Sequence, residues 1–243
     1  MRDPSHPIRR ELGPGYELFI VGLSILSLFN VAIAVLPFED DTKQVALIVD
    51  IVLSLIFMAD FLGRLYLADP RREYFIDRQG YLDLLGSLPL PILRIFRVVR
   101  VYRAIVRVSA MGGRRVVRHL IRARAQSALL FATFLVITIV ELGSIFVVAA
   151  ERSAPNANIR NGGDALWWAI VSVTTVGYGD RFPVTSAGRV IGTMLLIGGV
   201  GLFGVFTGYV AQVFLRPRAE DEPEPQAPVA AGSPSASRRE PPG

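Results

Sequence analysis

Long apolar runs constrain this chain more than any other feature of its sequence. A helix that crosses a lipid bilayer needs about 20 mostly apolar residues, and runs that approach this length occupy most of the chain. In chain order they are 16–37, 44–69, 81–90, 92–109, 126–150 and 185–215. The third is short, and the fourth alternates arginine with apolar pairs. We therefore expect an all-α membrane protein with six transmembrane helices.

The composition supports this fold class and excludes several classes of function. Hydrophobic residues make up 51% of the chain and its mean hydropathy is +0.43, above the usual value for a soluble domain. The chain has no cysteine and only two histidines, which excludes a disulfide scaffold, a thiol nucleophile and a histidine-rich zinc site. Lys43 is the only lysine among 26 basic residues. Because the arginines lie between apolar runs, we expect anionic membrane lipid, and no nucleic acid, as their partner.

The arginines between the runs predict the orientation in the membrane, because cytoplasmic loops collect positive charge. They cluster before the first run, after the second and after the fourth, whereas the opposite loops are acidic or mixed. With six spans, both termini of this multi-pass cell-membrane protein then lie in the cytoplasm. Residues 1–15 are expected to form a cytoplasmic N-terminus, and the proline-rich residues 216–243 a disordered cytoplasmic tail.

A distinctive motif lies between the last two long runs. The apolar stretch before it, DALWWAIVSVTT at 164–175, is too short to span a bilayer and is typical of a re-entrant helix. It continues into Thr-Thr-Val-Gly-Tyr-Gly-Asp at 174–180. This arrangement resembles the pore of tetrameric potassium channels, in which backbone carbonyls of TVGYG loops replace the water around the ion. The two glycines fit that role, since carbonyls can face one axis only where the backbone dihedrals alternate in hand.

The resemblance implies a role for each residue of this segment. The pore helix would cover 164–174 and the filter 175–179. Potassium would bind at the carbonyls of Thr175, Val176, Gly177 and Tyr178, with Gly179 completing the filter and with Trp167, Trp168 and Asp180 supporting it from behind. One filter strand cannot encircle an ion, so we expect a homotetramer that passes potassium ions and needs no cofactor. The alternative, a glycine-containing turn without a transport role, is disfavoured by a seven-residue match at this place.

The fourth run carries arginine at every third position, with one final step of four. The series is Arg94, Arg97, Arg100, Arg103 and Arg107. Apolar pairs separate the charges, and the series rises about 20 Å along a helix, a large part of the hydrocarbon thickness. Arginine in hydrocarbon is costly, so we expect acidic partners for it on neighbouring helices.

The second and third runs contain such acids, and the set resembles the sensor of bacterial six-helix voltage-gated potassium channels. The resemblance implies that the five arginines are gating charges, that Phe57, Asp60 and Asp83 form a charge-transfer site, and that Asp50 is an outer countercharge. Two alternatives stay open for the arginine series. It could be an amphipathic helix lying on anionic lipid, or part of a sensor-like domain that no longer moves.

The remainder of the pore module carries weaker signals. Residues 111–125 place apolar residues and arginines at helical spacing, which predicts an amphipathic linker helix at the cytoplasmic interface. Gly199 matches the hinge position of bacterial potassium channels, so we expect the last helix to bend there on opening. Candidates for a hydrophobic inner gate are Phe206, Val210 and Phe214. Glu141 lies in the middle of the fifth run, with its partner expected on the pore-helix backbone or on the last helix.

Together these patterns predict a voltage-gated, potassium-selective channel. Residues 16–110 would form a four-helix voltage-sensor domain, and 126–215 a two-helix pore domain with the re-entrant pore helix and filter loop. The conspicuous carboxylates are explained by arginine pairing, so no enzyme activity is expected. Two rival functions remain: a potassium channel gated by lipid or another stimulus with the sensor as a scaffold, and a non-conducting module that binds lipid at the membrane surface.

Overall fold

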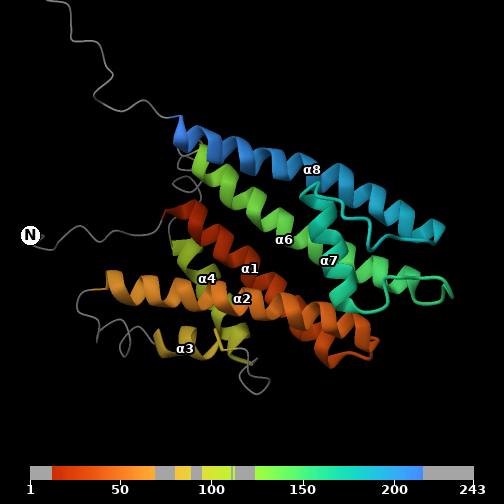
Figure 1. Ribbon diagram of the computed structural model, residues 1–243. Helices are drawn as coiled ribbons and strands as arrows, with labels where there is room; N and C mark the ends of the chain where they lie inside the picture. The colour runs from red at the N-terminus through yellow and green to blue at the C-terminus, as the bar shows by residue number, and fades with distance from the viewer. Residues whose placement is uncertain (1–12, 69–79, 89–94, 111, 113–123, 216–243) are drawn as a thin grey trace, which may run out of the picture.

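The computed structural model describes residues 13–68, 80–88, 95–110, 112 and 124–215 (Figure 1). These residues form helices and their connections, with no strand among them. In chain order the helices are α1 (Pro14–Val35), α2 (Asp40–Leu67), α3 (Gly80–Leu85), α4 (Ile95–Ala110), α6 (Arg124–Glu151), α7 (Gly162–Val173) and α8 (Ser186–Phe214). The expected all-α architecture is therefore confirmed for the described part of the chain.

Four of these helices are long and apolar enough to cross a membrane. They are α1, α2, α6 and α8, whose apolar segments have 22, 28, 25 and 27 residues. Within the described ranges α3 has only 6 residues and α4 has 16. These lengths support a multi-pass membrane protein, while the expected number of six spans stays a prediction.

The helices form two groups that lie side by side (Figure 1). The first group contains α1 to α4, and in the second α6 packs along α8 and against the short α7. The groups meet where α1 and α2 contact α6 and where α2 contacts α7. One core of buried apolar side chains crosses this boundary, with Leu23 and Leu53 on one side and Val147 and Ala169 on the other. The two groups are thus in direct contact within one chain.

Local sequence explains where the first two helices begin. Pro14 occupies the first turn of α1, where its missing N–H leaves no hydrogen bond unmade. Asp40 and Asp41 lie in the first turn of α2, where negative charge complements the helix dipole. The connection between the two helices covers only 36–39, which makes them antiparallel neighbours.

The third predicted run, 81–90, is helical only in part. Helix α3 ends at Leu85, and a turn follows in which the Gly86 N–H donates to the Leu82 carbonyl over 3.0 Å. A Cβ atom at Gly86 would lie 3.2 Å from the Phe96 carbonyl oxygen of α4. The glycine therefore lets the turn after α3 lie directly against α4, next to the first of its described arginines.

Several expectations from the sequence lie outside the described residues. They concern residues 1–12 of the N-terminus, Arg94, the linker helix at 111–125 apart from Gly112 and the start of α6, and the tail at 216–243. The side chain of Arg107 lies outside as well, although its backbone belongs to α4. Helix α6 begins at Arg124, two residues before the fifth run expected from 126.

Candidate functional site

Two arginines of α4 are buried between the helices of the first group. Arg97 and Arg100 have exposed fractions of 2% and 1%. Their spacing of three turns the helix by about 300°, so both side chains leave it on neighbouring parts of one flank. A guanidinium inside a membrane protein needs acidic and hydrogen-bonding partners, and the structure provides both kinds.

Arg97 forms an ion pair with Asp50 of α2. Its Nη2 also donates to Ser54 Oγ over 3.4 Å, and Ser27 Oγ of α1 donates to Asp50 Oδ1 over 3.3 Å. A hollow of about 210 Å³ opens beside this pair and is lined also by Asn30 and Lys43. The acid expected as an outer countercharge thus meets an arginine of the series at a site formed by three helices.

Arg100 contacts all three residues expected in the charge-transfer site. Its Nη2 lies 2.9 Å from Asp60 Oδ2, and its guanidinium carbon lies 3.9 Å from the centre of the Phe57 ring. Its Nη1 donates to Ser87 Oγ over 2.7 Å and to the backbone carbonyl of Asp83 over 3.3 Å. The carboxylate of Asp83 serves the next arginine, since Arg103 Nη1 lies 3.3 Å from Asp83 Oδ1.

Phe57 stands between the two acids of α2. At 1.5 Å per residue, Asp50 and Asp60 are about 15 Å apart along the helix, whereas Arg97 and Arg100 are only about 4.5 Å apart on α4. The guanidinium groups of Arg97 and Arg100 therefore diverge toward different acids, and the Phe57 ring lies against that of Arg100. The order of pairing is therefore the same along both helices.

Three residues that the sequence reasoning did not assign also belong to this cluster. Arg64 contacts Asp60 and Glu17, and the Tyr16 hydroxyl donates to Asp60 Oδ1 over 3.0 Å. Glu17 and Arg64 are ionisable residues inside apolar runs. That placement is the one sequence signal that could have revealed them.

The TTVGYGD motif at 174–180 follows α7 directly. Asn161 caps the start of α7, where its side chain accepts from the Asp164 N–H. At the other end, the N–H groups of Val176 and Gly177 donate to the Val171 carbonyl over 3.1 Å and 3.3 Å. These bonds tie the first residues of the loop to the last turn of α7.

The backbone of the motif is left-handed at three positions. Gly177 and Gly179 have φ angles of 60° and 77°, and Thr175 has a φ of 61°. Glycine adopts such angles without a steric penalty, but threonine does not. The strain at Thr175 lies at the residue expected to begin the filter, which is typical of a functional segment.

The expected supports of the filter separate into two places. The Trp167 ring stacks on Tyr178 with 5.7 Å between the ring centres, and its Nε1 donates to Asp180 Oδ2 over 2.9 Å. Trp168 is buried in the core, and a Cβ atom at Gly192 of α8 would lie 3.3 Å from its ring. The structure thus brings Trp167, Tyr178 and Asp180 together, whereas Trp168 packs toward α8.

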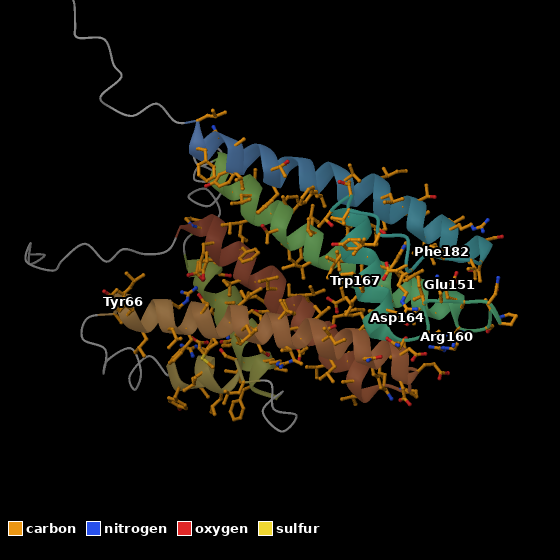
Figure 2. The ribbon with its side chains drawn as sticks, viewed as in Figure 1. Tyr66, Glu151, Arg160, Asp164, Trp167 and Phe182 are labelled. Atoms are coloured by element: carbon orange, nitrogen blue, oxygen red, sulfur yellow. The ribbon has the colours of Figure 1, made fainter. Side chains whose placement is uncertain are left out.

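The loops around the motif are held by residues that no pattern in the sequence singled out. Glu151, fully buried at the end of α6, accepts from the N–H groups of Val184 and Thr185 over 2.9 Å each and from the Thr185 hydroxyl over 2.7 Å. Arg181 pairs with Asp164 at 3.1 Å and donates to the Asn158 carbonyl over 2.6 Å. Figure 2 shows Glu151, Asp164, Trp167 and Phe182 gathered at the end of the molecule opposite Tyr66.

The last helix and Glu141 differ in part from expectation. Helix α8 continues through Gly199, where a Cβ atom would lie 2.5 Å from Val173 Cγ2. The structure therefore gives Gly199 a packing role against the end of α7, and its role as a hinge stays a prediction. The gate candidates Phe206, Val210 and Phe214 lie on exposed parts of α8.

Glu141 is fully buried beside Asn30 of α1, and neither carboxylate oxygen has a hydrogen bond within the described residues, so the partners expected on α7 or α8 are not found there.

Comparison with known proteins agrees with this geometry. The model of one family, described as Ion transport protein, matches residues 13–217. The chain belongs to the ion transport protein family. Membership in this family and the names of the relatives below confirm the resemblance to bacterial voltage-gated potassium channels.

Three proteins to which the chain is similar are described as potassium channels. A voltage-gated potassium channel of Aeropyrum pernix is 40% identical over 83 residues, which are 34% of this chain and 28% of that protein. A calcium-gated potassium channel of Thermoplasma volcanium, TvoK, is 32% identical over 90 residues, 37% of this chain and 25% of that protein. A putative potassium channel protein of Rhodopseudomonas palustris, RPA4233, is 25% identical over 217 residues, 81% of this chain and 52% of that protein. The chain thus spans about half or less of these relatives' lengths.

Proposed function

We propose that this chain forms a homotetrameric, potassium-selective ion channel that opens in response to membrane voltage. Family membership and the relatives described as potassium channels support this function. The observation that carries it furthest is the segment at 175–179, which follows the short helix α7 and has left-handed backbone at both glycines. No enzyme activity is part of the proposal.

Four copies of this segment around one axis would surround a potassium ion, the transported substrate, with backbone oxygens. The carbonyls of Thr175, Val176, Gly177 and Tyr178 would replace the water around the ion. One chain offers oxygens from one side only, which is the reason for a homotetramer. The contacts of Trp167 with Tyr178 and Asp180 would hold the width of the filter.

The buried arginines of α4 would make opening depend on voltage. Moving one elementary charge through the membrane field is worth about 2.3 kcal/mol per 100 mV, and several charges in each of four subunits supply on the order of tens of kcal/mol. The described part of the series already pairs three arginines with three acids. A shift of α4 would exchange these pairs, with Arg94 and Arg107 as further gating charges.

The proposal also places the chain in the membrane. Helices α3 and α4 would belong to the third and fourth of six spans in the cell membrane, with both termini in the cytoplasm. The cytoplasmic arginine clusters would contact anionic lipid headgroups.

Two other functions are the alternatives to this proposal. In a potassium channel gated by a ligand or lipid, α4 would be a fixed scaffold with the same ion pairs, and one relative is described as calcium-gated. A lipid-binding module at the membrane surface would not bury Arg97 and Arg100 among acids of neighbouring helices.

Reconstitution of the purified protein in planar bilayers separates the three functions. Current that prefers potassium to sodium and rises steeply with voltage supports the proposal. Selective current that does not depend on voltage supports a channel gated by a ligand or lipid. Lipid binding without current supports the lipid-binding module.

Two glycine variants give a matched control for the filter. Gly177→Ala places a side chain at a φ of 60° and should abolish potassium selectivity. Gly63→Ala, on α2, adds a methyl group with no atom within 4 Å and should conduct as the wild type does. Selective current from the Gly177→Ala channel would contradict the assignment of this segment as the filter.

A further inference from the structure

A charged cluster lies one helical turn beyond Asp60, toward the end of α2. Arg64 donates from Nε to Asp60 Oδ1 over 2.8 Å and from Nη1 to Glu17 Oε1 of α1 over 2.7 Å. The side chains of Arg64, Glu17 and Asp60 are 12%, 4% and 2% exposed. Tyr16 covers the cluster, with its ring centre 5.8 Å from the Arg64 guanidinium. These groups are therefore shielded from water, and their charges act strongly on their neighbours.

Asp60 is shared between a fixed cation and a cation of α4. Its Oδ1 accepts from Arg64 and Tyr16, whereas its Oδ2 accepts from Arg100. Arg64 is only four residues from Asp60 on the same helix, so it stays with the acid wherever α4 moves. Each arginine of α4 that arrives at Asp60 thus meets a carboxylate whose charge is already partly balanced.

We propose that Arg64, anchored by Glu17, is a fixed positive charge that biases α4 away from the Arg64 end of the sensor. The inference rests on the proposed function, in which α4 moves along its axis. In the proposed orientation the Arg64 end of α2 faces the cytoplasm, so the bias favours the outward position of α4. Arg64 is a positioning residue, because it acts on the arginines of α4 through Asp60 and through its own charge.

The sign of each substitution follows from Coulomb attraction in this buried cluster. Removing the positive charge of Arg64 leaves Asp60 and Glu17 more attractive to the arginines of α4. The population of the inward position of α4 therefore rises. Removing the negative charge of Glu17 has the opposite effect. The double change removes one charge of each sign, so the two effects cancel.

The absence of cysteine from the sequence permits a direct measurement of the position of α4. Val98 is 49% exposed on α4, and Val98→Cys provides a single thiol for an environment-sensitive fluorophore. The full chain carrying this label is expressed in a cell membrane under voltage clamp, and fluorescence is recorded against voltage. The midpoint of that curve reports the balance between inward and outward positions, independently of ion flow.

We expect Arg64→Gln to change the inward-to-outward ratio at fixed voltage by on the order of tenfold, with the midpoint at more positive voltage. Glu17→Gln should move the midpoint to more negative voltage, and the double variant should return within about twofold of the wild-type ratio. Arg64→Lys keeps the charge and should stay close to the wild type.

Arg160→Gln is the matched control, because it removes one positive charge at the opposite end of the molecule from Tyr66, as Figure 2 shows. It should leave the midpoint in place. An unchanged midpoint for Arg64→Gln, or shifts of equal sign for Arg64→Gln and Glu17→Gln, would overturn the inference while the proposed function stands. Should Arg64→Gln fail to reach the membrane, Glu17→Gln alone decides, since an absent or positive shift overturns the inference. Wild-type fluorescence that does not change with voltage would overturn the voltage gating in the proposed function, and the inference with it.

Discussion

Arg100 Nη2 lies 2.9 Å from Asp60 Oδ2, with 1% and 2% of these side chains exposed. The neighbouring arginines of α4 have acids of their own, Asp50 for Arg97 and Asp83 for Arg103. An acid therefore stands at each level of the described series. In the proposed voltage sensor, a step of α4 along its axis would exchange one ion pair for another, so that no arginine would be left without an acid.

Asp83→Asn should change the voltage dependence of the current and leave its selectivity intact. The substitution weakens the pair between Asp83 and Arg103, whose atoms lie 3.3 Å apart. Because Arg103 is 18% exposed, we expect a cost of about 2 kcal/mol, less than for a fully buried pair. Conductance–voltage curves in planar bilayers measure the effect, with Asp40→Asn at the exposed start of α2 as the control. An unaltered curve for Asp83→Asn would count against the charge-transfer site.

Trp167→Phe should reduce the preference for potassium over sodium severalfold. The phenylalanine ring can still stack on Tyr178 but cannot donate to Asp180, and the lost hydrogen bond is worth about 1 kcal/mol. Asp180→Asn is the matched variant, because its amide oxygen can still accept from Trp167. Reversal potentials under mixed potassium and sodium gradients measure the preference. Equal losses for both variants would show that the hydrogen bond is not what holds the filter.

Glu151→Gln should lower the free energy of unfolding of the purified protein by about 2 kcal/mol, because a buried carboxylate that accepts three hydrogen bonds loses its charge. The amide also turns an N–H₂ group toward donors of Val184 or Thr185. Thermal unfolding in detergent measures the change. Glu39→Gln, whose side chain is 69% exposed, should leave the midpoint within about a degree. Similar midpoints for Glu151→Gln and the wild type would contradict this role of Glu151.

Gly199→Ala should destabilise the protein by about 1–3 kcal/mol, because the added methyl group would lie 2.5 Å from Val173 Cγ2. The double variant Gly199→Ala, Val173→Ala makes room for the methyl group and should recover part of the loss. Gly63→Ala, also inside a helix but with open space around the added methyl group, is the matched control, because it gains the helix preference of alanine without a clash. If bending at Gly199 is what matters instead, current through the double variant stays impaired although its stability recovers.

Local features of the sequence were enough to predict the long apolar helices and their approximate ends. The first run, expected at 16–37, forms α1 at Pro14–Val35, and the shift at its end has a local cause. Leu36 precedes a proline and has an extended backbone, with φ −73° and ψ 158°, because the residue before proline avoids the helical region. The end of α3 inside the third run could not be predicted in this way, since the turn at Gly86 lies against α4, a contact between different helices.

The partners of the charged residues show where sequence reasoning ends. Spacing on one helix revealed the arginine series, and apolar surroundings revealed Asp50, Asp60 and Asp83 as candidate partners. Glu17 and Arg64 are 47 residues apart, and Glu151 and Thr185 are 34 apart. No spacing rule connects such pairs. Trp167 and Trp168 were expected to act together, yet adjacent helical residues point about 100° apart, and the structure sends one to Tyr178 and the other toward α8.

The amino-acid sequence by itself determined the long apolar helices of the described part of the chain and the place of the TTVGYGD motif after a short helix. Those features depend on hydropathy and on backbone preferences within a few residues. The tertiary structure alone decided which acid meets which arginine, that Asp60 divides its two oxygens between Arg64 and Arg100, and that Glu151 holds the loop before α8. The physical reason is that these contacts join different helices, whose relative positions follow from the packing of the whole group and not from the spacing along any one of them.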